Sequence, residues 1–445
     1  MKVLEGLQGN VLSGYGTDHA LYLFTRVRDA EAARRWLDAE RLGITTYRGW
    51  EEQRSETTLN AAFTYRGLIK LGVPALRIEH LSVFREGMRK RHILLGDIGD
   101  SDARNWDKGL RKNHVLLVLT ARDGDALAVA GVKLRQRIAA GSGLAILAEQ
   151  EAHRLPDGAE HFGVSDGFSQ PAVASVAGGG PRIGEGTLTR WRHWRRLALG
   201  EFVLGNRDEG GLFPPAPLGP LGDDATFMVV RKLAQHVAEF RSYIADTAGR
   251  LDRSPEWVRA KMIGRWDNGS ALARYPDAPG PSASRDPNAS RFRYGTDPKG
   301  LRCPRGAHVR RANPRDSGRW QGRMTQRHRI IRRGMPYGPP LAEVDGGQDR
   351  APRGLMFVCY QADIKRQFEF IQRQWLSDGD ALQLGSDPDP LVAPQGTRRG
   401  MVIPGQPGCP PVFLRGIPPF VTTRGGGYYL LPGTAGLRAL AAGAC

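Results

Sequence analysis

Nine-residue apolar segments run directly into amphipathic segments four times along the chain, twice in each half. In the first half HALYLFTRV (19–27) precedes DAEAARRWLDAERLG (29–43), and NHVLLVLTA (113–121) precedes GDALAVAGVKLRQRIAAG (124–141). In the second half ATFMVVRKL (225–233) precedes AQHVAEFRSYIADTAG (234–249), and RGLMFVCYQ (353–361) precedes ADIKRQFEFIQRQWL (362–376). Because apolar runs of this length are typical of buried strands and a 3.6-residue period is typical of helices, each pair predicts a strand followed by a helix.

The recurrence of these units predicts a duplicated architecture. LNAAFTYRG (59–67) and LAILAEQEA (144–152) supply further strands in the first half. This pattern matches a split β-α-β layout, in which helices cover one face of an antiparallel sheet. The prediction is an α+β fold of two ferredoxin-like halves. The Gly- and Pro-rich stretch at 175–187 is the expected boundary, which gives an N-terminal domain of residues 1–180 and a C-terminal domain of residues 181–445.

Composition describes a globular chain with a strong basic excess. The 445 residues are 40% hydrophobic and 25% charged, with a net charge of +18. This excess is compatible with a nucleic-acid-binding protein, for which RWRHWRR (190–196) interleaves aromatic rings and arginines, or simply with a solvated basic surface. No secretory signal or long apolar window is visible, and the four cysteines have no CxxC spacing. We therefore expect reduced thiols, a cytoplasmic location and no membrane association.

Three short motifs carry candidate chemistry. GVSDG (163–167) presents Asp166 between two glycines, either as a functional carboxylate or as an ordinary Asx-turn. RHRIIRRGMPYG (327–338) places Arg332 at the end of a short strand. GLRCPRGAHVRRANPRD (300–316) surrounds His308 with arginines. Taken alone, His308 is a surface residue, a nucleic-acid contact or a ligand.

In this order, the three motifs resemble those of the dye-decolorizing peroxidases, in the larger class often called C or D. The resemblance extends along almost the whole chain, through LQGNVLSGYG, NAAFTYRGLIKLG, GLMFVCYQADIKRQFEFIQ and FVTTRGGGYYLLPG. It implies two ferredoxin-like halves with one haem b per chain, held in the C-terminal half. It also implies oxidation of bulky aromatic substrates, such as anthraquinone or azo dyes and phenols, by hydrogen peroxide through a ferryl intermediate.

The resemblance assigns roles to three residues. It places the axial iron ligand on His308, the distal aspartate on Asp166 and the distal arginine on Arg332. A carboxylate can move the proton of hydrogen peroxide, and a guanidinium can stabilise the charge that develops as the O–O bond breaks. An aspartate beside a permanent cation stays ionised in acid, so the expected pH optimum is acidic.

Further cofactor-binding residues follow from the same resemblance. Leu355 and Phe357 match apolar side chains over the distal haem face, and their spacing of two puts both on one face of a strand. Arg315 resembles a residue that pairs with a haem propionate. An axial histidine normally donates its second N–H to a carboxylate or carbonyl, and we take Glu369, or else Asp363, as that partner.

Two other classes of function remain at this point. A haem carrier without turnover would keep His308 but would not need both Asp166 and Arg332. A basic nucleic-acid-binding protein would bind in a salt-dependent manner and show no haem absorption band. With a peroxidase as the leading hypothesis, we expect no specific nucleic-acid partner.

Overall fold

The computed structural model of the chain describes residues 4–174, 184–189, 193–317, 322, 324–341, 351–380, 382–397 and 399–444. The first half comprises β1 (His19–Val27), α1 (Ala30–Glu40), α2 (Tyr47–Glu52), β2 (Thr57–Phe63), α3 (Tyr65–Lys70), α4 (Ser82–Glu86), β3 (Val115–Ala121), α5 (Gly124–Ala139) and β4 (Leu144–His153). The second half begins with β5 (Thr187–Leu188), β6 (Trp194–Arg195), β7 (Thr226–Gln235), α6 (Val237–Leu251), α7 (Pro255–Ile263) and α8 (His308–Ala312). It continues with β8 (Ile331–Arg332), β9 (Met335–Tyr337), β10 (Gly354–Gln361), the π-helical segments η11 (Lys365–Glu369) and η12 (Ile371–Ser377), β11 (Gly400–Ile403), β12 (Val412–Arg415), β13 (Val421–Leu431) and α9 (Thr434–Ala442).

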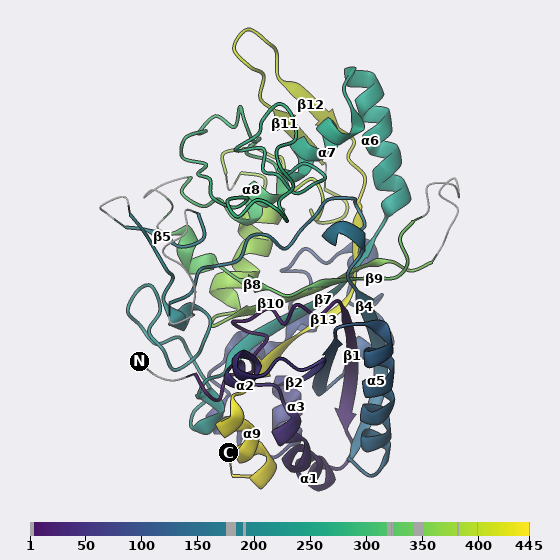
Figure 1. Cartoon of the computed structure of the whole chain (residues 1–445), viewed down its shortest axis with the longest axis vertical. Helices are drawn as coiled ribbons and strands as arrows, with labels where there is room; N and C mark the ends of the chain where they lie inside the picture. Colours follow the sequence, from purple (N-terminus) through teal and green to yellow (C-terminus); the bar gives the residue numbers. More distant parts are fainter. Residues whose placement is uncertain are drawn as a thin grey trace.

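One antiparallel sheet spans both halves of the molecule (Figure 1). Its order is β4-β1-β3-β2-β13-β7-β10-β8, with β9 also paired to β10. In each half the four main strands lie in the order fourth, first, third, second, which is the ferredoxin-like arrangement. The halves join where β2 meets β13, through the pair Phe63 and Leu430. The predicted α+β fold of two ferredoxin-like halves is confirmed.

The predicted strand-helix units occur where the apolar pattern placed them. β1 covers 19–27, and α1 and α5 are capped by the side chains of Asp29 and Asp123, as their sequences indicate. The segment 362–376 differs in its hydrogen bonding. It is helical but largely of the wider π type, so the residues that face each neighbour are not those of a regular α-helix.

Both faces of the sheet are buried. Along β1, Leu21 and Leu23 pack into one hydrophobic cluster, whereas Tyr22 and Phe24 pack into another. The first cluster includes the buried residues of α1 and α5, and the second includes residues from the start of the chain such as Leu7. Two buried faces explain why the strand sequences are continuously apolar rather than alternating.

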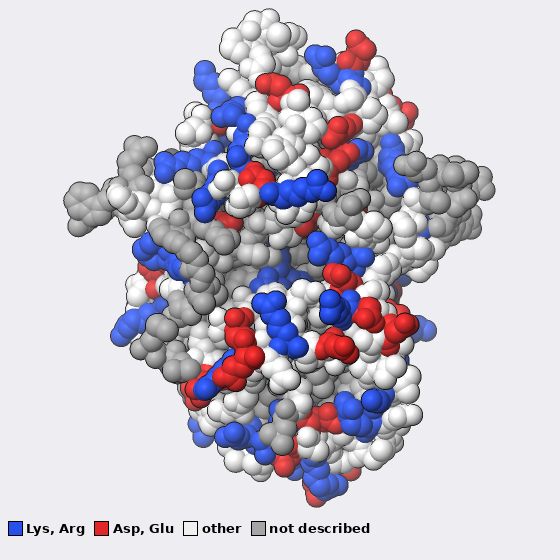
Figure 2. All heavy atoms as spheres, viewed as in Figure 1, with Lys and Arg blue, Asp and Glu red and all other residues white. Residues whose placement is uncertain are grey.

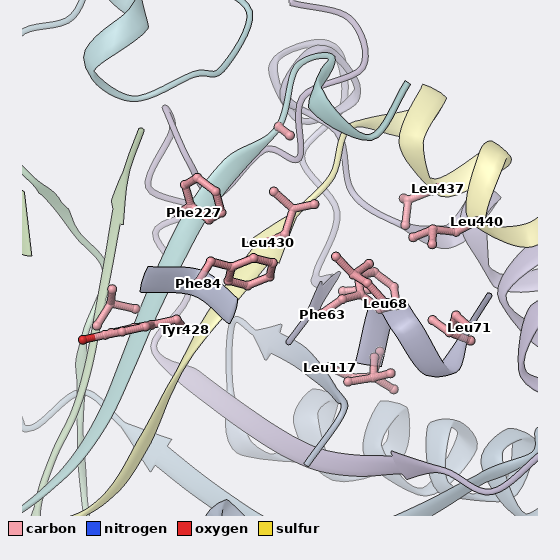
Figure 3. Packing of buried hydrophobic residues seen from close by; sticks show 14 of the residues in the cluster. Phe63, Leu68, Leu71, Phe84, Leu117, Phe227, Tyr428, Leu430, Leu437 and Leu440 are labelled. Atoms are coloured by element: carbon pink, nitrogen blue, oxygen red, sulfur yellow. The ribbon is translucent and has the colours of Figure 1, made fainter. Parts of the chain in front are cut away.

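The two ends of the chain share a core. Leu117 of β3, Phe227 of β7 and Leu430 of β13 belong to one cluster with Leu437 and Leu440 of α9 (Figure 3). The C-terminal helix α9 packs beside α1, near the start of the chain (Figure 1). Residues 175–183, where we placed the domain boundary, lie outside the described residues, so the division at 180/181 stays a prediction.

The basic residues are not confined to solvent. Figure 2 shows Lys and Arg interspersed with Asp and Glu on one face of the molecule. Arg310 and Arg311 of the His308 segment are buried: Arg310 binds Asp297, and Arg311 donates to three backbone carbonyls. Part of the basic excess therefore stabilises loops. None of the helices in the described ranges has the length and apolar character needed to span a bilayer.

Candidate active site

A cavity of about 300 Å³ is lined by residues of both halves, mostly of the second, and collects nearly all of the predicted site residues. The sequence-predicted residues on its wall are His308, Asp166, Arg332, Arg315, Leu355 and Phe357. They come from α8 and the loop that follows it, from the loop that follows β4, from β8 and from β10. Residues up to 191 positions apart in the chain thus meet at one site.

His308 is the first residue of α8 and presents its imidazole to the cavity. Its Nδ1–H donates to Oδ2 of Asp389 at 3.0 Å. Asp389 has no solvent exposure, and its other oxygen accepts from the backbone N–H groups of Leu391 and Val392. Burial opposes the charged imidazole, but Asp389 outweighs it and raises the pKa of His308. Nε2 is left free to bind a ligand, and no hydrogen bond to it occurs within the described ranges.

The predicted carboxylate partner of His308 was wrong. Glu369 is fully buried elsewhere, where it accepts two hydrogen bonds from Arg91, at 2.6 and 2.7 Å, and one from Tyr428 at 2.8 Å. Asp363 instead accepts from the backbone N–H of Arg366. Glu369 and Asp363 are therefore engaged with other partners, and Asp389 is the carboxylate that binds His308.

Asp166 and Arg332 form a two-bond ion pair on the cavity wall. Nη1 and Nη2 of Arg332 donate to the two carboxylate oxygens of Asp166 at 2.8 and 3.1 Å. Burial would raise the pKa of Asp166, but Arg332 outweighs it and lowers the pKa to about 2. Gly163 and Gly167 adopt φ values of +91° and +93°, which glycine tolerates without strain, and they form the tight turn that presents Asp166. The GVSDG motif is thus a presenting turn, as expected.

Gln170 fixes Arg332 relative to the Asp166 loop. Its side-chain amide donates to the carbonyl of Arg332 at 2.9 Å and accepts from the N–H of the same residue at 3.1 Å. This pairing ties the loop to β8, although the two segments are 162 residues apart. Sequence analysis missed Gln170, because a glutamine carries no signal of its partner.

Two buried arginines stand on another part of the cavity wall. Arg315 stacks on Phe292, with its guanidinium 3.7 Å from the ring centre, and donates to the carbonyls of Ser290 and Phe292. Arg329, which sequence analysis missed, has only long hydrogen bonds within the described residues, of 3.3 Å to the carbonyl of Gly184 and 3.5 Å to Gln326. Burial lowers the pKa of Arg315 to about 10 and that of Arg329 to about 9. The hydrogen-bond partners described for these two arginines are neutral, so the pair is suited to bind an anionic group.

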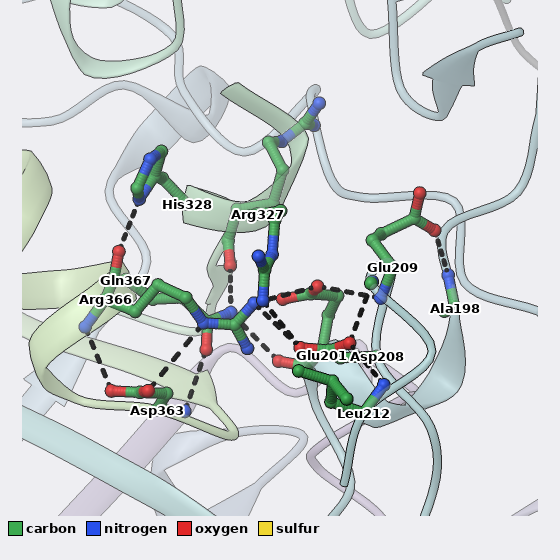
Figure 4. Close-up of polar contacts among 12 residues, drawn as sticks. Ala198, Glu201, Asp208, Glu209, Leu212, Arg327, His328, Asp363, Arg366 and Gln367 are labelled. Carbon is green, nitrogen blue, oxygen red and sulfur yellow. Dashed lines mark hydrogen bonds and ion pairs between the residues drawn. The ribbon is translucent and has the colours of Figure 1, made fainter. Parts of the chain in front are cut away.

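The remaining wall is mainly apolar. Leu355 and Phe357 stand on one face of β10, and Phe368 of the π-helix contacts Phe357 with ring centres 6.2 Å apart. His328, a second imidazole on this wall, is stacked on Phe370 at 3.7 Å. Its Nδ1 binds the carbonyl of Arg366, whose side chain joins Glu201 and Asp208 in a buried network (Figure 4). His328 has no carboxylate partner of the Asp389 kind in the described structure.

Comparison with known proteins agrees with this site. Residues 261–385 match the family model "Dyp-type peroxidase, C-terminal". The chain is 28% identical to Peroxidase 2 of Mycetinis scorodonius, covering 98% of this chain and 87% of that protein. It is also 28% identical to the multifunctional dye peroxidase DyP2 of an Amycolatopsis species, covering 98% and 96%. A solved dye-decolorizing peroxidase in complex with 2,6-dimethoxyphenol superimposes with a TM-score of 0.83 at 25% identity, covering 99% of this chain and 100% of that one.

The duplicated ferredoxin-like fold and the comparisons define an enzyme of the peroxidase class. More specifically, the chain resembles the DyP-type peroxidases along nearly its whole length, and residues 261–385 match their C-terminal domain. The donor set also suits a haem. It supplies one imidazole with a free Nε2, two buried guanidinium groups for carboxylates, and an apolar wall for a flat macrocycle.

Proposed function

We propose that the protein is a haem b peroxidase with one haem per chain, which uses hydrogen peroxide to oxidise bulky aromatic compounds. The observation that carries the proposal is that two hydrogen-bonded pairs, His308 with Asp389 and Asp166 with Arg332, supply side chains to one cavity. Support for aromatic substrates comes from relatives named as dye peroxidases and from a related structure that holds 2,6-dimethoxyphenol.

The proximal residues would hold the cofactor. Nε2 of His308 would bind the iron, and Asp389 fixes the tautomer and increases electron donation from the imidazole. Arg315 and Arg329 would pair with the propionates, which offsets the cost of burying these guanidinium groups. Leu355 and Phe357 would pack against the ring. When bound, the haem supplies the redox chemistry by which peroxide is reduced and aromatic substrates are oxidised.

The distal pair would handle the proton and the charge of the peroxide. Asp166 remains ionised at acidic pH because of Arg332, so it can accept a proton from hydrogen peroxide where a histidine would already be protonated. Asp166 would then pass this proton to the other oxygen, which leaves as water, and Arg332 is positioned to stabilise the negative charge that develops as the O–O bond breaks. Gln170 holds Arg332 in register with Asp166 during this step.

The function is tested by turnover of the haem-loaded protein with peroxide, using 2,6-dimethoxyphenol and an anthraquinone dye as substrates. We expect product formation that needs peroxide and is highest in acid, and we expect none with His308→Ala. A haem carrier, which has no use for Asp166 and Arg332, would bind haem through His308 yet show no peroxide-dependent oxidation. That result would contradict the proposal.

We also propose a cytoplasmic location. The proposal is supported by the thiols of the described residues: Cys303 and Cys359 are buried and Cys409 is exposed, and all three are free cysteines. Fractionation of the source cells with an antibody against the protein would test this location, and recovery outside the cytoplasm would contradict it.

A further inference from the structure

Glu160 is a second carboxyl group on the turn that presents Asp166, and it also lines the cavity. The turn closes through hydrogen bonds from Glu160 N–H to the carbonyl of Val164 and from Gly163 N–H to the carbonyl of Glu160. The carboxylate folds back over this turn and accepts from the N–H of Phe162 at 2.9 Å. It also accepts from the side-chain amide of Gln235, at the end of β7, at 2.6 Å. Glu160 is therefore held in place on the cavity wall.

Glu160 differs from the other carboxylates of the cavity because its partners are neutral. Asp166 is paired with Arg332, and Asp97 is paired with Arg231. Glu160, by contrast, is bound by backbone N–H groups and one amide, and no ion pair to it occurs in the described part of the chain. Burial, with a contribution from the negative charge of Asp166, raises the pKa of Glu160 to about 7. Two carboxyl groups on one turn, with pKa values pushed apart, suit opposite roles in proton transfer.

The half of the proposed reaction that oxidises the phenol needs a proton donor in the cavity. Asp166 cannot supply these protons because it is ionised. Reduction of one hydrogen peroxide to two waters consumes two electrons and two protons. Two phenol molecules each lose one electron and one proton, and a phenol too bulky for the cavity releases its proton to solvent. Protons must then return to the cavity separately. Asp166 is ionised above pH 2, and Arg332 holds its proton firmly, because Asp166 raises its pKa.

We infer that Glu160 is the proton donor of this cavity, delivering to the reduced oxygen the protons that accompany electrons from the substrate. The inference rests on the proposed peroxidase function. Each delivery breaks the O–H bond of the Glu160 carboxyl and forms an O–H bond of water, and solvent then reprotonates the carboxylate. Below neutral pH the carboxyl group of Glu160 carries a proton and the carboxylate of Asp166 can accept one. Glu160 would therefore act as the proton donor and Asp166 as the proton acceptor.

The neighbouring groups do not offer the same proton. His161, on the same turn, binds the carbonyl of Tyr337, and burial lowers its pKa, so it is neutral near pH 7. Arg332, Arg265 and Arg231 elsewhere on the wall are cations. Burial also raises the pKa of Asp97, but Asp97, unlike Glu160, is held by a cation, Arg231, which opposes this rise and favours the ionised carboxylate. The side-chain oxygen of Gln235 is buried and has no partner in the described residues. If the amide group rotates by about 180°, this oxygen can accept a hydrogen bond from the protonated carboxyl group of Glu160.

The test separates the two half-reactions of the haem-loaded enzyme by rapid mixing between pH 4 and 9. For the wild type we expect the step that consumes 2,6-dimethoxyphenol to slow above pH 7, by up to about tenfold per pH unit. We call this decline of the rate above pH 7 the limb of the pH–rate profile. Glu160→Gln should slow the phenol step about 100-fold at pH 5 and abolish the limb, while the peroxide-consuming step keeps its rate. Gln235→Met removes a donor to the ionised carboxyl and should move the limb upward by about one pH unit.

Infrared titration of the carboxylic-acid band provides a readout without turnover. Glu201 supplies a matched control, because burial also raises its pKa to about 7, yet it lies in the network of Figure 4 and not on the cavity wall. Glu160→Gln should remove one band that titrates near pH 7, and Glu201→Gln should remove another without changing the limb of the phenol step.

Two results overturn the inference in distinguishable ways. If Glu160→Gln retains the wild-type limb, or removes no titrating band, Glu160 is not the proton donor even though the enzyme is a peroxidase. If haem-loaded wild type does not react with peroxide at any pH, the proposed function fails and the inference falls with it, whatever the infrared titration shows.

Discussion

The two carboxylate pairs of the cavity, Asp389 with His308 and Asp166 with Arg332, differ in their exposure. The side chain of Asp389 is 0% exposed and that of its partner His308 is 28% exposed, whereas Asp166 is 52% and Arg332 35% exposed. Asp389 uses both oxygens on fixed donors, namely the imidazole and two backbone N–H groups. A carboxylate in that state can only hold its partner in place. Asp166 opens onto the cavity and can exchange a proton there.

The largest effect should come from removing the imidazole of His308, which Asp389 holds in place. His308→Ala should abolish the haem absorption band and lower peroxidase turnover at least about 1,000-fold, because the iron loses its protein ligand. His328→Ala is the matched control, since it removes the other imidazole from the wall. Haem titration followed by absorbance measures both variants. Equal loss in the two variants would mean that His308 is not the ligand.

The pair of Asp166 and Arg332, here called the open pair, should not be needed for haem binding. Breaking it should lower the rate of the reaction with peroxide. Asp166→Asn removes the base and Arg332→Leu removes the cation, and each should slow this step by about 100- to 1,000-fold. Rapid mixing with peroxide measures the rate, and the haem absorption band confirms loading. If either variant lost haem instead, the open pair would serve binding rather than reaction.

Asp389→Asn tests whether the buried carboxylate acts through the imidazole. A neutral amide oxygen accepts the hydrogen bond of the imidazole more weakly than a carboxylate, so the imidazole donates less electron density to the iron. We therefore expect haem affinity to fall about 10- to 100-fold and the ferric/ferrous potential to rise. Glu369→Gln is the control, because Glu369 binds Arg91 and Tyr428 instead. It should leave the potential unchanged. A shift with Glu369→Gln and none with Asp389→Asn would reverse the assignment.

The pH dependence of the open pair follows from the low pKa of Asp166. Its folded pKa of about 2 lies below the ordinary value of about 3.9, so its stabilising contribution is present above pH 4 and is lost as the pH falls towards 2. We expect the peroxide step to persist down to about pH 3. Wild type should also lose more stability than Asp166→Asn between pH 4 and 2, as measured by thermal unfolding. Parallel stability curves would contradict the pairing.

The smallest effect should come from Gln170, which ties the open pair together. Gln170→Ala removes two hydrogen bonds to the backbone of Arg332 and should cost about 1–3 kcal/mol of stability. Urea unfolding of the apoprotein measures this cost. A loss within error would show that the loop and β8 hold each other without the amide.

The sequence predicted the parts of this site that lie within short motifs. Strands and helices followed from apolar periodicity, and Asp166, Arg332 and His308 were found because each stands at a fixed place in a recognisable segment. Asp389 was missed, because it lies 81 residues after His308 in a loop of alternating Asp and Pro whose path no periodicity describes. Glu369 was chosen instead as a carboxylate in a family-like segment, but that segment is π-helical and its Glu369 binds Arg91. Arg329 was hidden among the many arginines of its segment.

The central claim is that Asp166 and Arg332 act on peroxide at a haem held by His308. It is tested most directly by mixing haem-loaded protein with one equivalent of hydrogen peroxide and recording the haem absorption band. We predict a rapid spectral change in the wild type and, in Asp166→Asn and Arg332→Leu loaded with the same haem, the same change at least about 100 times more slowly. A wild-type spectrum that does not change, or variants that react at the wild-type rate, would contradict it.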